Sequence, residues 1–440
     1  MKKYPSYKPS GIDWLGDIPE GWVVLPIKRI VSTPVTDGPH ETPELFDEGI
    51  PFISAEAIRS NKIDFNKKRG FISESEHRRF CLKYHPRRDD IYMIKSGATT
   101  GNLAIVETDE EFSIWSPLAV IRVHIEKANA RYVLLAMGSS NFQTSVQLFW
   151  SFGTQQNIGM NVIQNLVLPI PPLPEQQQIA SFLDKKTAQI DTLIEKKQKM
   201  MELLKEKRAA IINHAVTKGL NPNVKLKPSG IDWLGDIPEG WTRIKIKYLS
   251  IVKRGASPRP IDDPKYFDDN GEYSWVRIAD VTASGRYLES TKQQLSELGS
   301  SLSVKMAPGE LFLSIAGTVG KPIITNIKCC IHDGFVYFPL LKINPEYLYY
   351  IFSGGEAYKG LGKWGTQLNL NTETVGDIHI ALPPMNELQN IIAFLDKKTA
   401  QIDKFVEMTN KQIELLKEYR TTLISEVVTG KVDVRDEVTA

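Results

Sequence analysis

The strongest constraint on the fold is that the chain repeats itself. Residues 8–22 read KPSGIDWLGDIPEGW, and residues 227–241 repeat all fifteen letters unchanged. A second repeat follows in the same order, because residues 182–191 and 394–403 both read FLDKKTAQID. The copies lie about 210–220 residues apart, which is too long for a solenoid repeat of roughly 20–50 residues and long enough for a domain plus a helix. The sequence therefore predicts two tandem modules with pseudo-twofold symmetry, suited to a partner with two related halves.

Composition narrows the class of protein. The 440 residues are 42% hydrophobic, as in a globular protein, and no apolar run approaches the roughly 20 residues that span a bilayer. The lysines near the amino terminus have no apolar stretch behind them, so this segment does not read as a secretory signal. Cys81, Cys329 and Cys330 form neither a disulfide framework nor a zinc-binding spacing. We therefore expect a cytoplasmic protein without a bound metal.

The first repeat reads as an ordered loop. It is rich in Gly, Pro and Asp, which favour turns, and each copy carries two tryptophans whose rings gain by burial. We interpret the two copies as structural clasps anchored by Trp14, Trp22, Trp233 and Trp241.

The second repeat predicts two long helices. Each begins just after a proline and ends near a glycine, at about residues 175–217 and 387–429, for a length of about 63 Å each. Both copies place a polar residue, Lys197 or Thr409, in the middle of an apolar heptad position, which weakens a coiled coil but sets its register. The second inward-facing position of the heptad carries both apolar and charged residues, so a strict two-stranded zipper is not indicated. We expect the helices to pair with each other, antiparallel, through Leu183, Ile190, Leu204, Ile211, Leu395, Ile402, Leu416 and Leu423.

The regions between the repeats align only weakly. Residues 96–101 resemble residues 314–320, and residues 51–54 align with residues 273–276. Short β-type runs broken by Gly and Pro indicate mixed α/β domains with a small curved sheet. A Gly-Thr-Gln triplet precedes each long helix, and we expect both triplets to orient a domain against its helix: Gly153, Thr154, Gln155, Gly365, Thr366 and Gln367. The competing interpretation is that Gln155 and Gln367 read adenine.

The predicted fold class is α+β, with two tandem mixed α/β domains separated by two long antiparallel helices. The predicted boundaries are 1–172 for the first domain, 173–218 for the central helix, 219–382 for the second domain and 383–440 for the last helix region. The first repeat and the long helix are nearly identical between the two copies, whereas the sequences of the globular regions between them differ. Two recognition domains with different targets on one shared frame would produce that pattern.

At this point the layout resembles the specificity subunit of type I restriction-modification systems. The resemblance rests on the KPSGIDWLGDIPEGW openings, the helix starts PPLPEQQQIASFLDKKTAQID and PPMNELQNIIAFLDKKTAQID, and the Gly-Thr-Gln triplets, and it spans the whole chain. It implies a non-catalytic subunit whose target-recognition domains each read half of a split, asymmetric DNA site. It also implies partners: double-stranded DNA, two methyltransferase subunits bound by the helices, and restriction subunits. S-adenosylmethionine, ATP and Mg²⁺ would then be bound by those partners and not by this chain.

The net charge of +2 does not itself indicate DNA binding, so a DNA-binding chain of this charge would need a locally basic surface or phosphate contacts supplied by a partner. The best candidate is the Lys253–Arg259 segment, because three positive charges surround a flexible turn, and Arg commonly reads guanine edges. A solvated loop is the competing interpretation. The DNA-binding candidates are Asp37, His40, Thr42, Lys95, Thr99 and Thr100 in the first domain, and Lys253, Arg254, Ser257, Arg259 and Lys363 in the second.

Other functions are disfavoured by missing motifs. Gly317–Lys321 lacks the glycine spacing and the following Ser or Thr of a phosphate-binding loop, and the double prolines lack the residues of an amino-methyltransferase motif. The histidines form no close helical pair of the HExxH type. Two alternatives remain open at this point: a coiled-coil scaffold with duplicated protein-binding domains and no DNA role, and an enzyme such as a nuclease.

Overall fold

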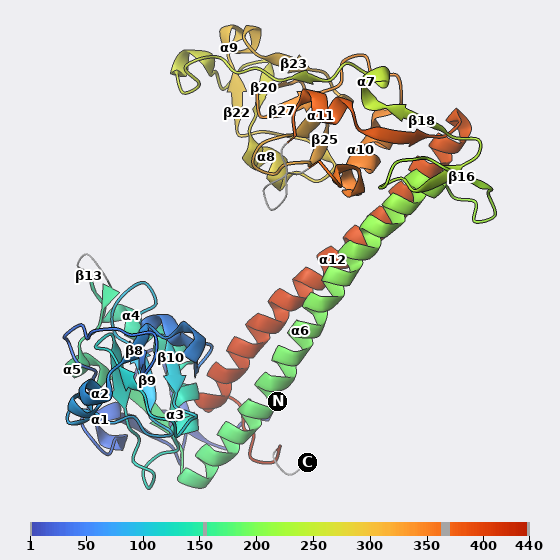
Figure 1. Cartoon of the computed structure of the whole chain (residues 1–440). Coiled ribbons are helices and arrows are strands. Elements are labelled where there is room, and N and C mark those ends of the chain that lie inside the picture. Colours follow the sequence, from blue (N-terminus) through green and yellow to red (C-terminus); the bar gives the residue numbers. More distant parts are fainter. Residues whose placement is uncertain (1, 153–155, 362–369, 438–440) are drawn as a thin grey trace. The chain divides into compact units, whose positions relative to one another are not determined.

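The computed structural model describes residues 2–152, 156–361 and 370–437, which fall into two compact units (Figure 1). The first unit comprises Met1–Lys197 and Lys411–Ala440, and the second comprises Gln198–Asn410. Each long helix, α6 (Leu173–Lys218) and α12 (Met385–Val428), therefore belongs to one unit at its start and to the other at its end. Within the described ranges, no helix is both long and apolar enough to span a membrane.

The first unit is built on two small sheets. Among its described residues, a four-stranded sheet has the order β10-β9-β12-β4, and a three-stranded sheet has the order β11-β5-β8 with β11 parallel to β5. The inner strands read IYMI and LAVI, and all eight side chains are buried because both faces of the sheet are covered. The helices are α1 (Ile27–Ile30), α2 (Glu74–Cys81), α3 (Ala130–Met137), α4 (Ser140–Leu148) and α5 (Met160–Ile163). The strands are β1 (Tyr7–Pro9), β2 (Asp17–Pro19), β3 (Val23–Pro26), β4 (Thr36–Asp37), β5 (Ile50–Ile53), β6 (Ile58–Arg59), β7 (Lys62–Ile63), β8 (Gly70–Ile72), β9 (Ile91–Ile94), β10 (Leu103–Ile105), β11 (Ser113–Ile114), β12 (Leu118–Ile121), β13 (Ser151–Phe152), β14 (Gln156–Asn157) and β15 (Val167–Ile170).

The second unit repeats this plan with additions. In its described part, a five-stranded sheet has the order β19-β27-β24-β25-β21, and a four-stranded sheet has the order β22-β20-β26-β23 with β20 parallel to β26. Strands β21 and β23 extend the pattern of the first unit. The helices are α7 (Ile246–Leu249), α8 (Ile278–Ala283), α9 (Glu297–Ser301), α10 (Pro345–Ser353) and α11 (Thr372–Gly376). The strands are β16 (Leu226–Pro228), β17 (Asp236–Pro238), β18 (Thr242–Lys245), β19 (Lys253–Arg254), β20 (Tyr273–Val276), β21 (Tyr287–Leu288), β22 (Gln293–Leu295), β23 (Val304–Met306), β24 (Leu311–Ser314), β25 (Pro322–Thr325), β26 (Cys329–Ile331), β27 (Phe335–Tyr337) and β28 (His379–Leu382).

Strand pairing corrects one part of the sequence alignment. Ile50 pairs with Ile72 at the start of β5, as Tyr273 pairs with Leu295 at the start of β20. Phe52 is therefore the counterpart of Trp275, and both side chains are buried. The alignment of residues 51–54 with 273–276 is thus wrong by one residue, because an alternating pattern does not by itself define register.

Each clasp, expected as an ordered loop, contains a short hairpin, β1–β2 or β16–β17. Of the four expected anchors, Trp22 and Trp241 are buried, whereas Trp14 and Trp233 are half-buried. The Trp22 indole N–H donates to the Glu175 carboxylate at 3.1 Å, and Trp241 donates to Glu387 at 2.9 Å. Both rings are buried, because the carboxylate satisfies the indole N–H that burial would otherwise leave unpaired. The Tyr7 hydroxyl donates to the Gly430 carbonyl at 3.0 Å, so the end of α12 lies under the clasp of the first unit.

In each unit, half of α6 lies antiparallel to half of α12 (Figure 1). Asp191 pairs with Arg420 at 2.9 Å in the first unit, and Asp403 pairs with Arg208 at 2.8 Å in the second. Asp403 and Arg420 are the residues 212 positions after Asp191 and Arg208, the same offset as between the FLDKKTAQID copies (394 − 182). The two ion pairs are therefore pseudo-twofold mates. The expected α+β class with two mixed domains and two antiparallel helices is confirmed.

The helix seam differs from the expected heptad in one respect. The residues four positions after the chosen apolar positions face inward: Thr187, Thr399 and Ile413 are buried, and Ile194 is half-buried. Leu193 and Met200, which the expected heptad placed at its second inward-facing position, are exposed. The apolar positions chosen from the sequence therefore form one row of the seam, and the residues four positions after them form the other row. The mixed residues three positions after them lie outside the seam. Lys197, a polar member of the seam, donates to Gln412 of α12 at 2.6 Å.

Candidate nucleic-acid interface

A glycine at the end of one edge strand positions the candidate loop in each unit. Gly38 follows β4, and a Cβ there would lie 2.3 Å from the Ile114 carbonyl oxygen. Gly255 follows β19, and a Cβ there would lie 2.2 Å from the His332 carbonyl oxygen. Only glycine permits such a close approach of two backbone segments. Both candidate loops therefore start from the same place in the fold, against the end of β11 or β26.

In the first unit the candidate cations gather around one buried carboxylate. Asp37 Oδ1 lies 2.5 Å from Lys83 Nζ, and Asp37 Oδ2 lies 3.2 Å from Lys95 Nζ and 3.0 Å from His40 Nε2. Burial acts to raise the pKa of Asp37, but hydrogen bonds from Lys83 and Lys95 outweigh it and hold the pKa below its ordinary value. The carboxylate therefore stays ionised and aligns these basic side chains. Sequence reasoning missed Lys83, which carries no local motif.

An aromatic side chain extends this surface. The Arg69 guanidinium lies 4.1 Å from the centre of the Trp115 ring, and the Trp115 indole N–H donates to the Glu41 carbonyl at 3.2 Å. Trp115 follows β11, so its ring lies beside the loop that carries His40 and Thr42. The basic run Lys67–Arg69 was the sequence signal for this part of the surface, and it was overlooked.

The three candidate threonines differ in accessibility. Thr42 and Thr99 are exposed. Thr100 is only 7% exposed, and its hydroxyl donates to the Gly97 carbonyl at 2.7 Å. The structure therefore disfavours Thr100 as a DNA contact, because its hydroxyl is already used to close the Gly97–Gly101 turn.

In the second unit three candidates converge on Asp333, in the turn between β26 and β27. The Ser257 hydroxyl donates to Asp333 Oδ1 at 3.1 Å, and the Arg259 guanidinium donates to Oδ2 at 2.9 Å. The Arg254 guanidinium donates to the Asp333 backbone carbonyl. Partial burial acts to raise the pKa of Asp333, but Ser257 and Arg259 lower it below its ordinary value. Arg259 remains 68% exposed, and Lys253 is exposed on β19.

Some candidates lie outside the described residues. These are Lys363 and all six residues of the Gly-Thr-Gln triplets: Gly153, Thr154, Gln155, Gly365, Thr366 and Gln367. Their predicted roles remain predictions.

The lysine of the Gly317–Lys321 segment has a structural partner. Its ammonium donates to the backbone carbonyls of Thr282 at 3.1 Å and Ser284 at 2.6 Å. Burial lowers the pKa of Lys321. The residue therefore holds the end of α8.

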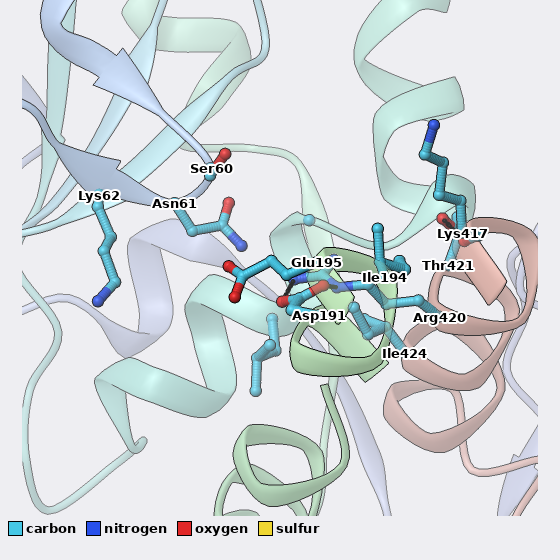
Figure 2. Close-up of a pocket in the computed structure, with 12 residues that line it drawn as sticks. Ser60, Asn61, Lys62, Asp191, Ile194, Glu195, Lys417, Arg420, Thr421 and Ile424 are labelled. Carbon is cyan, nitrogen blue, oxygen red and sulfur yellow. Dashed lines mark hydrogen bonds and ion pairs between the residues drawn. The ribbon is translucent and has the colours of Figure 1, made fainter. Parts of the chain in front are cut away.

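A cavity of about 730 Å³ lies elsewhere in the first unit, beside its half of the helix pair (Figure 2). The turn of the β6–β7 hairpin, at Ser60 and Asn61, faces the Asp191–Arg420 ion pair across it. Glu195 and Lys417 add charge to its wall. None of the candidate DNA-contacting residues lines this cavity, so it is a separate feature of the helix region.

Comparison with known proteins agrees with this organisation. A family model described as the type I restriction modification DNA specificity domain matches residues 19–203 and 238–417. A protein of Methanocaldococcus jannaschii, provisionally designated the MjaX specificity subunit of a type I restriction enzyme, is 25% identical over 96% of this chain and 96% of its own. The EcoKI specificity subunit of Escherichia coli is 22% identical over 94% of this chain and 90% of its own. A solved structure titled for complex assembly and conformational transition of the type I R-M system has a TM-score of 0.73 and 17% identity, and covers 94% of this chain and 99% of its own.

Proposed function

Since the chain belongs to the family of type I restriction-modification DNA specificity subunits, we propose that each of its two domains reads one half of a bipartite, asymmetric DNA site. The role of the chain is DNA specificity and not catalysis, as for its relatives. The scaffold without a DNA role is not favoured, because the family model that matches both halves is one for DNA specificity.

One observation carries the proposal for two unlike half-sites. The candidate loops leave equivalent strands, β4 and β19, through equivalent close-packed glycines, yet they present different chemistry. The first unit offers Lys83, Lys95 and His40 around Asp37, with Trp115 alongside. The second offers Arg254, Ser257 and Arg259 around Asp333. Equivalent placement with unlike donors supports recognition of unlike base sequences.

Arg259 is the strongest candidate for reading a base. A guanidinium can donate two hydrogen bonds to guanine O6 and N7 in the major groove, and each good bidentate contact discriminates by about 1–3 kcal/mol. Asp333 holds one side of the guanidinium and leaves most of it exposed. Ser257 and Lys253 suit phosphate contacts, which position the protein but carry no sequence information.

The helix pair is the proposed docking surface for methyltransferase subunits. Leu193 and Leu415 are exposed in the first unit, and Phe405 and Leu203 are exposed in the second. Phe405 and Leu415 lie 212 positions after Leu193 and Leu203, so the second set repeats the first by pseudo-symmetry. A duplicated apolar patch fits two copies of one partner. S-adenosylmethionine, ATP and Mg²⁺ would be bound by partner subunits, and restriction subunits would join the same complex in the cytoplasm.

The proposal is tested by mapping adenine methylation made by the complex of this chain with its methyltransferase partners. We expect a gapped motif with two unlike halves. Replacing residues 242–382 with the second domain of another family member should change one half only.

Arg259→Ala should relax one position of the same half by about ten-fold or more, in line with the loss of a bidentate contact. Exposed Arg88→Ala, which pairs with Asp109 in the first unit, serves as the matched control. Methylation without a gapped motif, or a swap that alters both halves, would contradict the proposal.

A further inference from the structure

Three side chains with metal-binding atoms gather at the end of α2 in the first unit. His77 and Cys81 are four residues apart, so they share one face of the helix. The chain turns after Cys81, and His85 Nδ1 lies 3.2 Å from Cys81 Sγ. One donor atom from each of these three residues lies within 4.8 Å of the others.

Glu111, from the segment before β11, lies on the His77 side of this group of three and offers an oxygen for a fourth position. Its Oε2 lies 3.6 Å from His77 Nε2, and Cys81 Sγ lies 3.6 Å from the same nitrogen. Zinc bonds of about 2.0–2.3 Å in a tetrahedron place neighbouring donor atoms about 3.3–3.8 Å apart. The two separations of 3.6 Å fall within that range, and the separation of 3.2 Å between His85 Nδ1 and Cys81 Sγ lies just below it.

The orientation of His77 is also that of a metal ligand. Its ring is almost fully buried, and its Nδ1 lies 2.8 Å from the Ser113 hydroxyl. A hydrogen bond at one ring nitrogen, with the other directed at the metal, is the usual outer-shell arrangement of ligating histidines.

We propose that His77, Cys81, His85 and Glu111 bind one Zn²⁺ ion. One sulfur, two nitrogens and one oxygen are donors that Zn²⁺ accepts in tetrahedral sites. The proposal departs from the sequence expectation of no metal. That expectation considered cysteine spacing and histidine pairs separately, whereas the site combines a lone cysteine with one histidine four residues before it, one histidine four residues after it and a carboxylate from another element.

The site would link α2 to β11 beneath the candidate interface. The turn after α2 carries Lys83, which pairs with Asp37, and β11 leads into Trp115. The bound ion would therefore stabilise the surface that carries the first recognition loop. The counterpart segment in the second unit, residues 296–303, reads SELGSSLS and contains neither histidine nor cysteine. One ion per chain is the expected stoichiometry.

Metal analysis of the untagged full-length chain, purified with its partner subunits if it requires them, tests the site directly. Partner subunits alone supply the baseline. We expect one equivalent of zinc above that baseline. After replacement by Co²⁺, we expect a thiolate-to-cobalt charge-transfer band with the strong visible bands of a tetrahedral ion. Cys81→Ser should abolish the charge-transfer band.

Variants at the exposed rim guard against a simple folding defect. His85→Ala and Glu111→Gln should fold and weaken zinc binding at least ten-fold in a competition with a chromogenic chelator. His214→Ala removes an exposed histidine of α6 and should leave zinc binding unchanged. Substoichiometric zinc that Co²⁺ cannot replace, or the same cobalt spectrum in wild type and Cys81→Ser, would overturn the proposal. The measurement needs no DNA, so its failure would leave the proposed function standing.

Discussion

At the scale of single residues, each recognition surface is organised by one acidic side chain. In the proposed function, Asp37 and Asp333 do not read bases themselves. They hold cations in place, as the pairs with Lys95 and Arg259 show. A preorganised cation loses less side-chain entropy on binding than a free one, which strengthens a contact without adding a new one. The carboxylates therefore set the geometry that the basic residues present.

Asp37→Asn should destabilise the first unit by about 3 kcal/mol, because removing one partner of a buried ion pair leaves the other charges uncompensated. Its depressed pKa means that the stabilisation is present above the ordinary value of 3.8 and is lost as the pH falls below it. The difference in unfolding free energy between wild type and Asp37→Asn should therefore shrink below about pH 4. Chemical denaturation at several pH values measures this. A difference that stays constant with pH would contradict the assigned ion pair.

At the scale of elements, two repeated ion pairs and a shifted apolar seam define how the helices pair. Asp191–Arg420 and Arg208–Asp403 require an antiparallel arrangement, because residue numbers rise on one helix as they fall on the other. The seam itself contains Thr399, Thr409 and Lys197, so it is less apolar than a zipper. Polar seam residues lower stability and favour one register.

Reversing one ion pair tests the register. Asp191→Arg alone should destabilise the chain, because it opposes Arg420 with a like charge. Asp191→Arg combined with Arg420→Asp should recover most of the loss. Both side chains are partly exposed, so the coupling energy should be no more than about 1 kcal/mol. A double-mutant cycle by thermal unfolding measures it, and zero coupling would mean that this pair does not contribute to the register.

Lengthening the helices tests whether they set the gap in the DNA site. Four residues inserted after Lys199 and after Lys411, which are equivalent positions, extend each helix by about 6 Å. We expect the gap between half-sites to grow by about two base pairs, since a turn of about 34 Å contains about ten. The bases of each half-site should not change. Methylation mapping gives the answer, and altered half-sites with an unchanged gap would exclude the helices as the spacer.

At the scale of the whole molecule, both ends of the chain contribute to the first unit. The Asp433 backbone N–H donates to the Lys2 carbonyl at 2.9 Å, and Val432 and Val434 are buried in its core. The corresponding end of α6 in the second unit is continuous with the clasp that covers it. In the first unit, the end of α12 is therefore joined to the clasp by noncovalent contacts. In the second unit, the end of α6 is joined to the equivalent clasp by the chain itself.

Deleting residues 431–440 should therefore destabilise the first unit and leave the second nearly unaffected. Loss of two buried valines and of the Tyr4–Arg435 contact should cost about 2–4 kcal/mol. Hydrogen exchange measured by mass spectrometry distinguishes the units, with faster exchange expected in residues 2–26 only. Equal changes in residues 227–245 would contradict this assignment.

The duplication, the two long helices and the family follow from the sequence alone, because exact repeats and helical periodicity are local patterns that need no tertiary information. It also indicated the Lys253–Arg259 segment, because three charges around a turn are visible in one stretch. Tertiary structure decided what depends on distant residues meeting: Asp333 beneath Arg259, Lys83 against Asp37, and the inward hydroxyl of Thr100. The seam register and the match of Phe52 to Trp275 also required it, because packing chooses between neighbouring registers that a repeating apolar pattern leaves nearly equal.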